Sequence, residues 1–181
     1  MNHYEIWLEP IGNKKSLSVL NDFPNLIIIQ TLSKAYAMAG LRVGILYASR
    51  EIITILNKIK PPYNINELSQ ETAIKKLNQS TMPAQVKKII TERNRLEMAF
   101  SRCSFIEKVF PSEANFILIK VDDANFRYQQ FLENGVVVRN RSNQPLCENC
   151  LRISVGTKEE TEQIIELLKT FNNAEKSIIY R

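Results

Sequence analysis

The residues best suited to covalent chemistry lie in the stretch Thr31–Gly44, Thr-Leu-Ser-Lys-Ala-Tyr-Ala-Met-Ala-Gly-Leu-Arg-Val-Gly. Its lysine, Lys34, stands among small apolar residues that would favour the neutral amine, the form that adds to an aldehyde to give a Schiff base. Arg42 follows eight residues later, and its planar guanidinium suits two-point contact with a phosphate. Gly40 lets the backbone approach a bound anion, and Ser33 adds a hydroxyl donor. An amine for an aldehyde, together with groups for a phosphate, suits pyridoxal 5′-phosphate.

Two strands and a helix are expected to position these side chains. The β-branched run Leu26–Ile29 predicts a buried strand that presents Lys34 at its C-terminal end, the end at which α/β sheets bind ligands. Val43–Ala48 predicts a second strand. Ser49 then caps a predicted helix with apolar residues at helical spacing, and two consecutive prolines end this helix at Lys60.

The segments Ser33–Tyr36 and Ala39–Gly44 together resemble the lysine segment of fold-type I, pyridoxal-phosphate-dependent aminotransferases, most closely that of the histidinol-phosphate aminotransferase family. The resemblance implies that Lys34 holds the cofactor and then, as a free amine, moves the proton of the substrate Cα. It also implies that Ser33 and Arg42 hold the cofactor phosphate. On the residues alone, a buried strand followed by a loop with an incidental lysine and arginine is the alternative.

One motif of the resembled family is absent. In that family an Asp-Glu-Ala-Tyr motif precedes the lysine segment, and its aspartate pairs with the pyridine nitrogen of the cofactor. The corresponding place here holds Tyr4-Glu5-Ile6-Trp7. The acid matters because protonation of the ring nitrogen makes the cofactor an electron sink. The family also has a long N-terminal half ahead of this segment, so we expect the C-terminal portion of an aminotransferase, from a truncated gene, a partial gene model or a fragment.

The second half of the chain alternates predicted strands and helices, which is typical of a layered α/β domain. Helices are expected at 67–77, 83–100, 124–133 and 158–171, and strands at 105–110, 115–121, 136–139 and 151–155. Gly135 occupies a helix C-cap position, and Thr157 with Glu160 forms a capping box for the last helix. The resemblance implies a remnant of the cofactor-binding large domain at 1–65, connecting helices at 66–102, and a small C-terminal α/β domain at 103–181.

Two arginines and one asparagine of this second half are candidates for substrate binding. Arg152 lies in the strand sequence Leu-Arg-Ile-Ser-Val-Gly-Thr, where a half-buried guanidinium needs a partner and no carboxylate is close in sequence. A structural ion pair and a substrate carboxylate are equal alternatives on the residues alone. The resemblance implies that Arg152 holds the substrate carboxylate, that Arg139 binds the substrate phosphate, and that Asn115 lies at the mouth of the site. Arg141 is expected to be a solvated neighbour.

The activity implied by the resemblance is a ping-pong transamination of histidine biosynthesis, between L-histidinol phosphate and 2-oxoglutarate, giving imidazole acetol phosphate and glutamate. The implied cofactor is pyridoxal 5′-phosphate, the implied substrates are small amino-acid and phosphate compounds, and the implied assembly is a homodimer. The alternatives are decarboxylation of threonine phosphate, transamination of aromatic amino acids, and a non-catalytic remnant that keeps the fold.

Composition argues against several other classes of protein. Of the 181 residues, 44% are hydrophobic and 24% are charged, as in ordinary globular domains. The net charge of +5 is interleaved with acidic residues along the chain, which indicates a solvated surface and not a nucleic-acid footprint. No run is long enough for a membrane span, and the N-terminus has no apolar signal region, so a cytoplasmic protein is expected. Three cysteines and one histidine argue against a disulfide framework and a metal site, although Cys147 and Cys150 have zinc or redox spacing.

Overall fold

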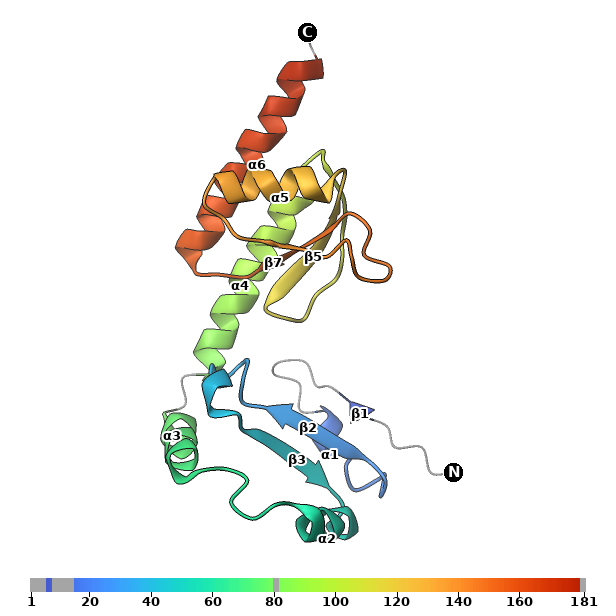
Figure 1. Ribbon diagram of the computed structural model, residues 1–181, viewed down its shortest axis with the longest axis vertical. Coiled ribbons are helices and arrows are strands. Elements are labelled where there is room, and N and C mark those ends of the chain that lie inside the picture. The colour runs from blue at the N-terminus through green and yellow to red at the C-terminus, as the bar shows by residue number, and fades with distance from the viewer. Residues whose placement is uncertain (1–5, 8–14, 80–81, 180–181) are drawn as a thin grey trace. The chain divides into compact units, whose positions relative to one another are not determined.

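The computed structural model of the protein describes residues 6–7, 15–79 and 82–179, with side chains for residues 17–79 and 82–173 (Figure 1). The chain forms two compact units, Met1–Val86 and Lys87–Arg181. The sequence predicted three segments with boundaries at residues 65 and 102, and that division remains a prediction.

The first unit is built on a three-stranded sheet with the strand order β1-β2-β3. β1 (Ile6–Trp7) runs parallel to β2 (Ile27–Thr31), and β2 runs antiparallel to β3 (Gly44–Ala48). The helical segments, coloured blue to green in Figure 1, are α1 (Lys15–Ser18), the 3₁₀ turn η1 (Ala39–Leu41), α2 (Arg50–Ile59), α3 (Glu67–Asn78) and the start of α4 (Met82–Phe100).

The strands and the helix expected around the lysine segment are confirmed, with boundaries shifted by one or two residues. Ser49 caps α2 by accepting the N–H of Ile52 at 3.5 Å, and α2 ends ahead of the two prolines. The expectation that β2 is buried throughout is wrong, because Ile28 is buried whereas its neighbour Ile29 is 43% exposed. β2 therefore has one covered face and one open face in the described part of the unit.

The second unit contains a four-stranded antiparallel sheet with the order β4-β5-β7-β6. The strands are β4 (Ile106–Val109), β5 (Phe116–Val121), β6 (Arg139–Asn140) and β7 (Cys150–Ser154). The helices are the remainder of α4, α5 (Ala124–Glu133) and α6 (Lys158–Ile179).

A hydrophobic core joins α4, α5 and α6 to one face of this sheet. Its buried side chains include Leu96, Phe100, Ile117, Ile119, Phe131, Leu151, Ile153 and Leu168. Because Ile119 pairs with Leu151 and Leu118 pairs with Arg152, the first pair shares the core face and the second shares the opposite face. This opposite face is called the arginine face below.

The strand predicted at 136–139 is largely wrong, and the glycine before it gives the reason. Gly135 has a φ of 76°, which confirms its place at the C-terminus of α5. The N–H groups of Gly135 and Val136 donate to Leu132 O and Phe131 O at 3.0 and 2.9 Å. This Schellman-type ending commits the first N–H groups after α5 to the helix, so strand pairing begins only at Arg139.

The capping box predicted for α6 is confirmed. Thr157 N donates to Glu160 Oε2 at 2.7 Å, and Glu160 N donates to Thr157 Oγ1 at 3.3 Å. The remaining helices and strands agree with the prediction to within one residue at each end, except that α6 continues to Ile179. Over the described residues, no helix combines the length and apolarity needed to cross a bilayer, and no group of three potential metal ligands is found.

Candidate active site

The connection from β2 to β3, residues 32–43, carries all the residues expected to bind the cofactor and is called the lysine loop. The two ends of the loop, called its neck below, are joined by a hydrogen bond in which Leu32 N donates to Val43 O at 3.2 Å. Inside the loop, Met38 N donates to Leu32 O at 3.0 Å. The lysine loop is therefore a folded turn structure held by its own backbone.

Two buried side chains fix the lysine loop on the small core of the first unit. Leu32 and Met38 are 1% and 3% exposed, and they pack with Ala73 of α3. With these two side chains turned inward, Lys34 and Arg42 are left exposed. The buried side chains thus anchor the lysine loop on the core, while its charged groups remain exposed.

Lys34 is exposed, so the apolar enclosure expected for its amine is wrong for the described residues. Its carbonyl accepts the N–H of Ala37 at 2.9 Å, and Ala37 has a left-handed φ of 53°. Such a conformation costs a residue with a side chain roughly 1–3 kcal/mol, and it occurs often at functional sites. The turn after Lys34 is therefore strained, and the amine is accessible to a ligand.

Hydroxyl groups and a guanidinium flank the neck of the lysine loop. Ser33 follows Leu32 and Arg42 precedes Val43, so the hydrogen bond that closes the neck sets their backbones opposite one another. Thr31 Oγ1 donates to Ser33 Oγ at 2.8 Å and accepts the Ser33 N–H at 3.0 Å. Sequence reasoning missed Thr31, although a second hydroxyl two residues before Ser33 was the available signal.

The strained residue at the neck is Arg42 and not Gly40. Arg42 ends η1 with a left-handed φ of 55°, and its Nη1 donates to Ala39 O at 3.2 Å. A Cβ built on Gly40 would meet no atom within 4 Å. The space beside Gly40 is open, and its use by a bound anion stays a prediction.

The functional groups of the lysine loop and Thr31 fit the aldehyde and the phosphate of pyridoxal 5′-phosphate. Lys34 has an exposed amine, and an amine can condense with an aldehyde. Hydroxyl and guanidinium groups can bind phosphate, and those of Thr31, Ser33 and Arg42 lie on residues beside the hydrogen bond between Leu32 and Val43.

The acid for the ring nitrogen is expected near the start of the chain. Of the four residues there, Tyr4 and Glu5 lie outside the described residues, and Ile6 and Trp7 form β1 beside β2. Neither isoleucine nor tryptophan is an acid, so β1 does not hold the acidic residue expected for the ring nitrogen.

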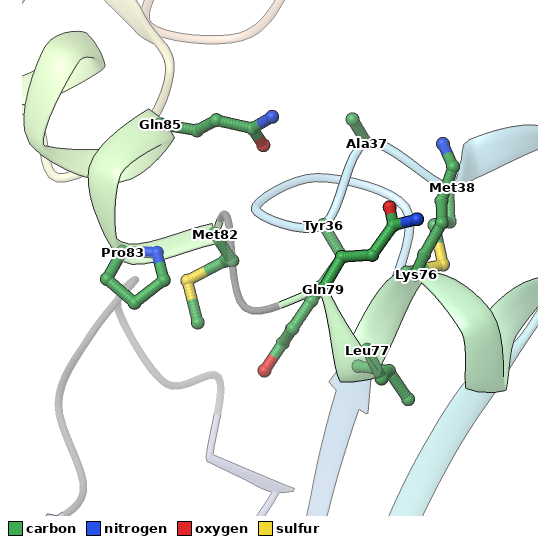
Figure 2. Close-up of a pocket in the computed structure, with 9 residues that line it drawn as sticks. All are labelled: Tyr36, Ala37, Met38, Lys76, Leu77, Gln79, Met82, Pro83 and Gln85. Atoms are coloured by element: carbon green, nitrogen blue, oxygen red, sulfur yellow. The ribbon is translucent and has the colours of Figure 1, made fainter.

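A cavity of about 360 Å³ lies against the turn that follows Lys34. Figure 2 shows that Tyr36, Ala37 and Met38 of the lysine loop line it, together with residues from the end of α3 and the start of α4. Those residues are Lys76, Leu77, Gln79, Met82, Pro83 and Gln85. The residues expected to bind the cofactor, Ser33, Lys34 and Arg42, are not among the residues that line this cavity.

In the second unit, the two predicted substrate arginines are opposite one another on neighbouring strands. Arg139 of β6 pairs with Arg152 of β7, so both side chains belong to the arginine face. Arg152 Nε is buried and has no hydrogen-bond partner among the described residues, and the guanidinium carbon lies 5.1 Å from the centre of the Phe116 ring. Within the described residues no carboxylate pairs with Arg152. The structural ion pair that the sequence left open is therefore not formed there.

Asn115 lies just before β5 and is half-buried. Its backbone carbonyl accepts the N–H of Val155 at 2.9 Å, which ties the beginning of β5 to the end of β7. The structure thus gives its backbone a place in the sheet, and a contact of its side chain with substrate stays a prediction.

A family model for aminotransferase class I and II matches residues 8–168. The chain belongs to this family. The matched range contains all the residues that the sequence singled out: Ser33, Lys34, Arg42, Asn115, Arg139 and Arg152. The similarity to the family therefore covers most of the chain and not only the short motifs.

Relatives within the family carry more specific names. A histidinol-phosphate aminotransferase of Flavobacterium psychrophilum is 65% identical over 165 residues, which are 91% of this chain and 48% of that protein. The chain spans about half the length of the curated relatives that it matches.

Solved structures of the family have the same fold. The crystal structure of histidinol-phosphate aminotransferase from Clostridium acetobutylicum matches with a TM-score of 0.80 and 25% identity, over 94% of this chain and 53% of that one. The enzyme from Sinorhizobium meliloti, solved in complex with pyridoxal-5'-phosphate, matches with a TM-score of 0.66 and 26% identity, over 83% of this chain and 43% of that one. The predicted fold class, α/β and part of a fold-type I aminotransferase, is confirmed.

Proposed function

We propose that this chain is the part of a histidinol-phosphate aminotransferase that carries the cofactor lysine. The observation that carries the proposal is the 65% identity to the Flavobacterium psychrophilum enzyme, over a range that includes the whole lysine loop. Because the chain spans about half of that relative, the proposal concerns the whole protein. That protein would exchange the amino group of L-histidinol phosphate for the oxo group of 2-oxoglutarate, giving imidazole acetol phosphate and glutamate.

Three residues of the lysine loop would hold pyridoxal 5′-phosphate. When bound, this cofactor supplies an electron-withdrawing ring that stabilises negative charge at the substrate Cα. The amine of Lys34 would hold the cofactor through its aldehyde, and as a free amine Lys34 would move the proton at the substrate Cα. Ser33 and Arg42 bind the phosphate. The exposure of Lys34 and Arg42 supports these roles, because both groups are open to a ligand.

Two arginines would bind the two kinds of anion that the reaction brings to the site. Arg152 binds the carboxylate of glutamate and 2-oxoglutarate, for which a guanidinium is a two-point partner. Arg139 binds the phosphate of histidinol phosphate, and Asn115 lies at the mouth of the site. The unpartnered Nε of Arg152 supports its role, because a buried donor needs an acceptor.

A cytoplasmic homodimer is the state we propose for the whole enzyme, as the resemblance to the family implies. Light scattering of the purified protein measures the assembly, and a monomer at all concentrations would contradict it.

An amino-transfer assay tests the proposal on two proteins: this chain, and this chain joined to the N-terminal half of the Flavobacterium psychrophilum relative. Each is supplied with pyridoxal 5′-phosphate and 2-oxoglutarate, and glutamate is measured with L-histidinol phosphate, L-phenylalanine or threonine phosphate as the other substrate. We expect the joined protein to prefer L-histidinol phosphate. A preference for phenylalanine, or release of carbon dioxide from threonine phosphate, would replace the proposal by a sister activity. No transfer by either protein would leave a non-catalytic remnant.

A further inference from the structure

A third arginine lies beside the two substrate arginines. Beyond the pair of Arg139 and Arg152, Arg141 N donates to Cys150 O at 2.8 Å and continues the pairing of β6 with β7 by one rung. Side chains alternate along paired strands, so Arg141 belongs to the arginine face with Arg139 and Arg152. Arg141 is half-buried whereas Arg139 is exposed, which makes the expectation of a merely solvated Arg141 wrong.

The positive charges of Arg139 and Arg141 act on the guanidinium of Arg152. Burial, and then the positive charges of Arg141 and of Arg139, hold the pKa of Arg152 below its usual value. Like charges on facing residues destabilise a sheet. The arrangement therefore carries an unfavourable electrostatic energy unless an anion is added.

Several cations of the second unit have an acid partner, whereas these three have none among the described residues. Lys120 of β5 lies 3.0 Å from Glu107, Arg127 lies 2.5 Å from Asp122, and Arg95 pairs with Glu92 at 2.7 Å. Among the described residues, no carboxylate comes within ion-pair distance of Arg139, Arg141 or Arg152. A negative charge that neutralises these three arginines would therefore come from outside the described residues.

We propose that Arg141 binds the phosphate of the substrate together with Arg139 and selects for a dianionic phosphate monoester. This inference rests on the proposed function, which assigns Arg152 to a carboxylate and Arg139 to a phosphate. A phosphate monoester carries close to two negative charges at neutral pH, and its oxygens accept several charge-assisted hydrogen bonds. A second arginine on the same face supplies the second positive charge, so a monoanion of the same shape is bound less well.

Equilibrium binding to the full chain tests this role without requiring catalysis. The ligands are L-histidinol phosphate, its sulfate-ester analogue with one charge fewer, and unphosphorylated L-histidinol, and their dissociation constants are measured by titration calorimetry at pH 8. Arg141→Gln should weaken binding of the phosphate about tenfold or more and binding of the sulfate ester only about twofold. Binding of L-histidinol should not change. Arg141→Lys should restore part of the lost affinity, because it keeps the charge and loses the planar fork.

Arg102→Gln is the matched control, because Arg102 is an exposed arginine of the same unit and its removal changes the net charge equally. If Arg141→Gln and Arg102→Gln have equal effects, or if Arg141→Gln weakens all three ligands equally, the selective role of Arg141 is overturned. Arg139→Gln separates the two levels of the proposal. If Arg139→Gln weakens phosphate binding and Arg141→Gln does not, only the inference on Arg141 fails. If the unmodified chain binds the phosphate no better than L-histidinol, the proposed substrate fails and the inference fails with it.

Discussion

Arg127 of α5 and Arg152 of β7 both hold guanidinium atoms in the interior of the second unit, and within the part of the chain that the structure describes only Arg127 has an acid partner. Arg127 is 2% exposed, and its Nε and Nη2 donate to the two carboxylate oxygens of Asp122 at 2.9 and 2.5 Å. It also lies 4.1 Å from the centre of the Phe105 ring. The sequence singled out Arg152 because a charge within an apolar strand stands out. It missed Arg127 because charged residues are ordinary in an amphipathic helix.

The pair of Arg127 and Asp122 gives a prediction for stability. Replacing Asp122 by Asn leaves a buried guanidinium without its counter-charge, a change that costs roughly 3–5 kcal/mol in fully buried pairs. Because the side chain of Asp122 is 46% exposed, we expect about 2 kcal/mol from urea unfolding at neutral pH. Glu113→Gln, at an exposed carboxylate of the same unit, should change the unfolding free energy by less than about 0.5 kcal/mol. Equal effects of the two substitutions would contradict a structural role for the pair.

The same carboxylate predicts a pH dependence. The hydrogen bond from Arg127 holds the pKa of Asp122 below its usual value. A carboxyl group whose pKa falls on folding contributes its full stabilisation above the unfolded value, about 3.9, and loses it as pH falls toward the folded value. The difference in unfolding free energy between the unmodified protein and Asp122→Asn should therefore shrink below about pH 4. A difference that stays constant down to pH 2 would exclude this linkage.

Arg139 and Arg152 should separate in their effects on the two substrates. If Arg139 binds phosphate and Arg152 binds carboxylate, Arg139→Ala raises KM for L-histidinol phosphate about tenfold or more and KM for glutamate less than about twofold. Arg152→Ala should raise KM for glutamate most. Steady-state kinetics of the joined protein measure both, and equal changes for both substrates would remove the phosphate role of Arg139.

At the scale of secondary structure, local sequence signals predicted most of the helices and strands. They failed where a turn or a tertiary contact determined the conformation. The strands on both sides of the lysine loop follow from their β-branched runs, and the capping residues Ser49 and Thr157 are visible in the sequence. The strand expected at 136–139 failed because the ending of α5 at Gly135 redirects the first N–H groups. The exposure of Lys34 depends on which side chains the loop turns inward, and those side chains pack against Ala73, which is distant in sequence.

Gly156, directly before the capping box of α6, is required by the position of Glu160. A Cβ built on Gly156 would contact the carboxylate of Glu160 and come within 2.9 Å of its Cβ. Gly156→Ala should therefore displace Glu160, remove its hydrogen bond to Thr157 N, and destabilise the protein by about 1 kcal/mol. In the Glu160→Ala background the same substitution should be neutral or slightly stabilising, because alanine lowers the entropy of the unfolded chain. Additive effects in thermal or urea unfolding would show that Glu160 is not the cause.

At the scale of the whole molecule, the two units differ in how much core they contain. Among the described residues, the second unit buries a large cluster drawn from three helices and a sheet, whereas the buried cluster of the first unit contains Leu32, Met38 and Ala73. Composition and periodicity predicted an α/β chain with both parts. Composition and periodicity could not predict this difference in core size, because burial depends on which helices and strands pack against one another.

The difference in core size predicts unequal local stability. In hydrogen exchange followed by mass spectrometry, amides of the lysine loop should exchange long before those of β5 and β7. The expected difference in opening free energy is at least about 2 kcal/mol. Exchange of both units at one common rate would mean that they unfold as a single cooperative body.

Covalent capture of pyridoxal 5′-phosphate at Lys34 is the most direct measurement of the proposed cofactor role. The full chain is incubated with the cofactor, reduced with borohydride, digested, and its peptides are sequenced by mass spectrometry. We predict a modified Lys34, no modification at this site in Lys34→Ala, and weaker labelling in Arg42→Ala, whereas Arg50→Ala, at an exposed arginine outside the loop, is labelled normally. Labelling of other lysines with Lys34 unmodified, or total labelling that is equal in Lys34→Ala, would contradict the role of Lys34.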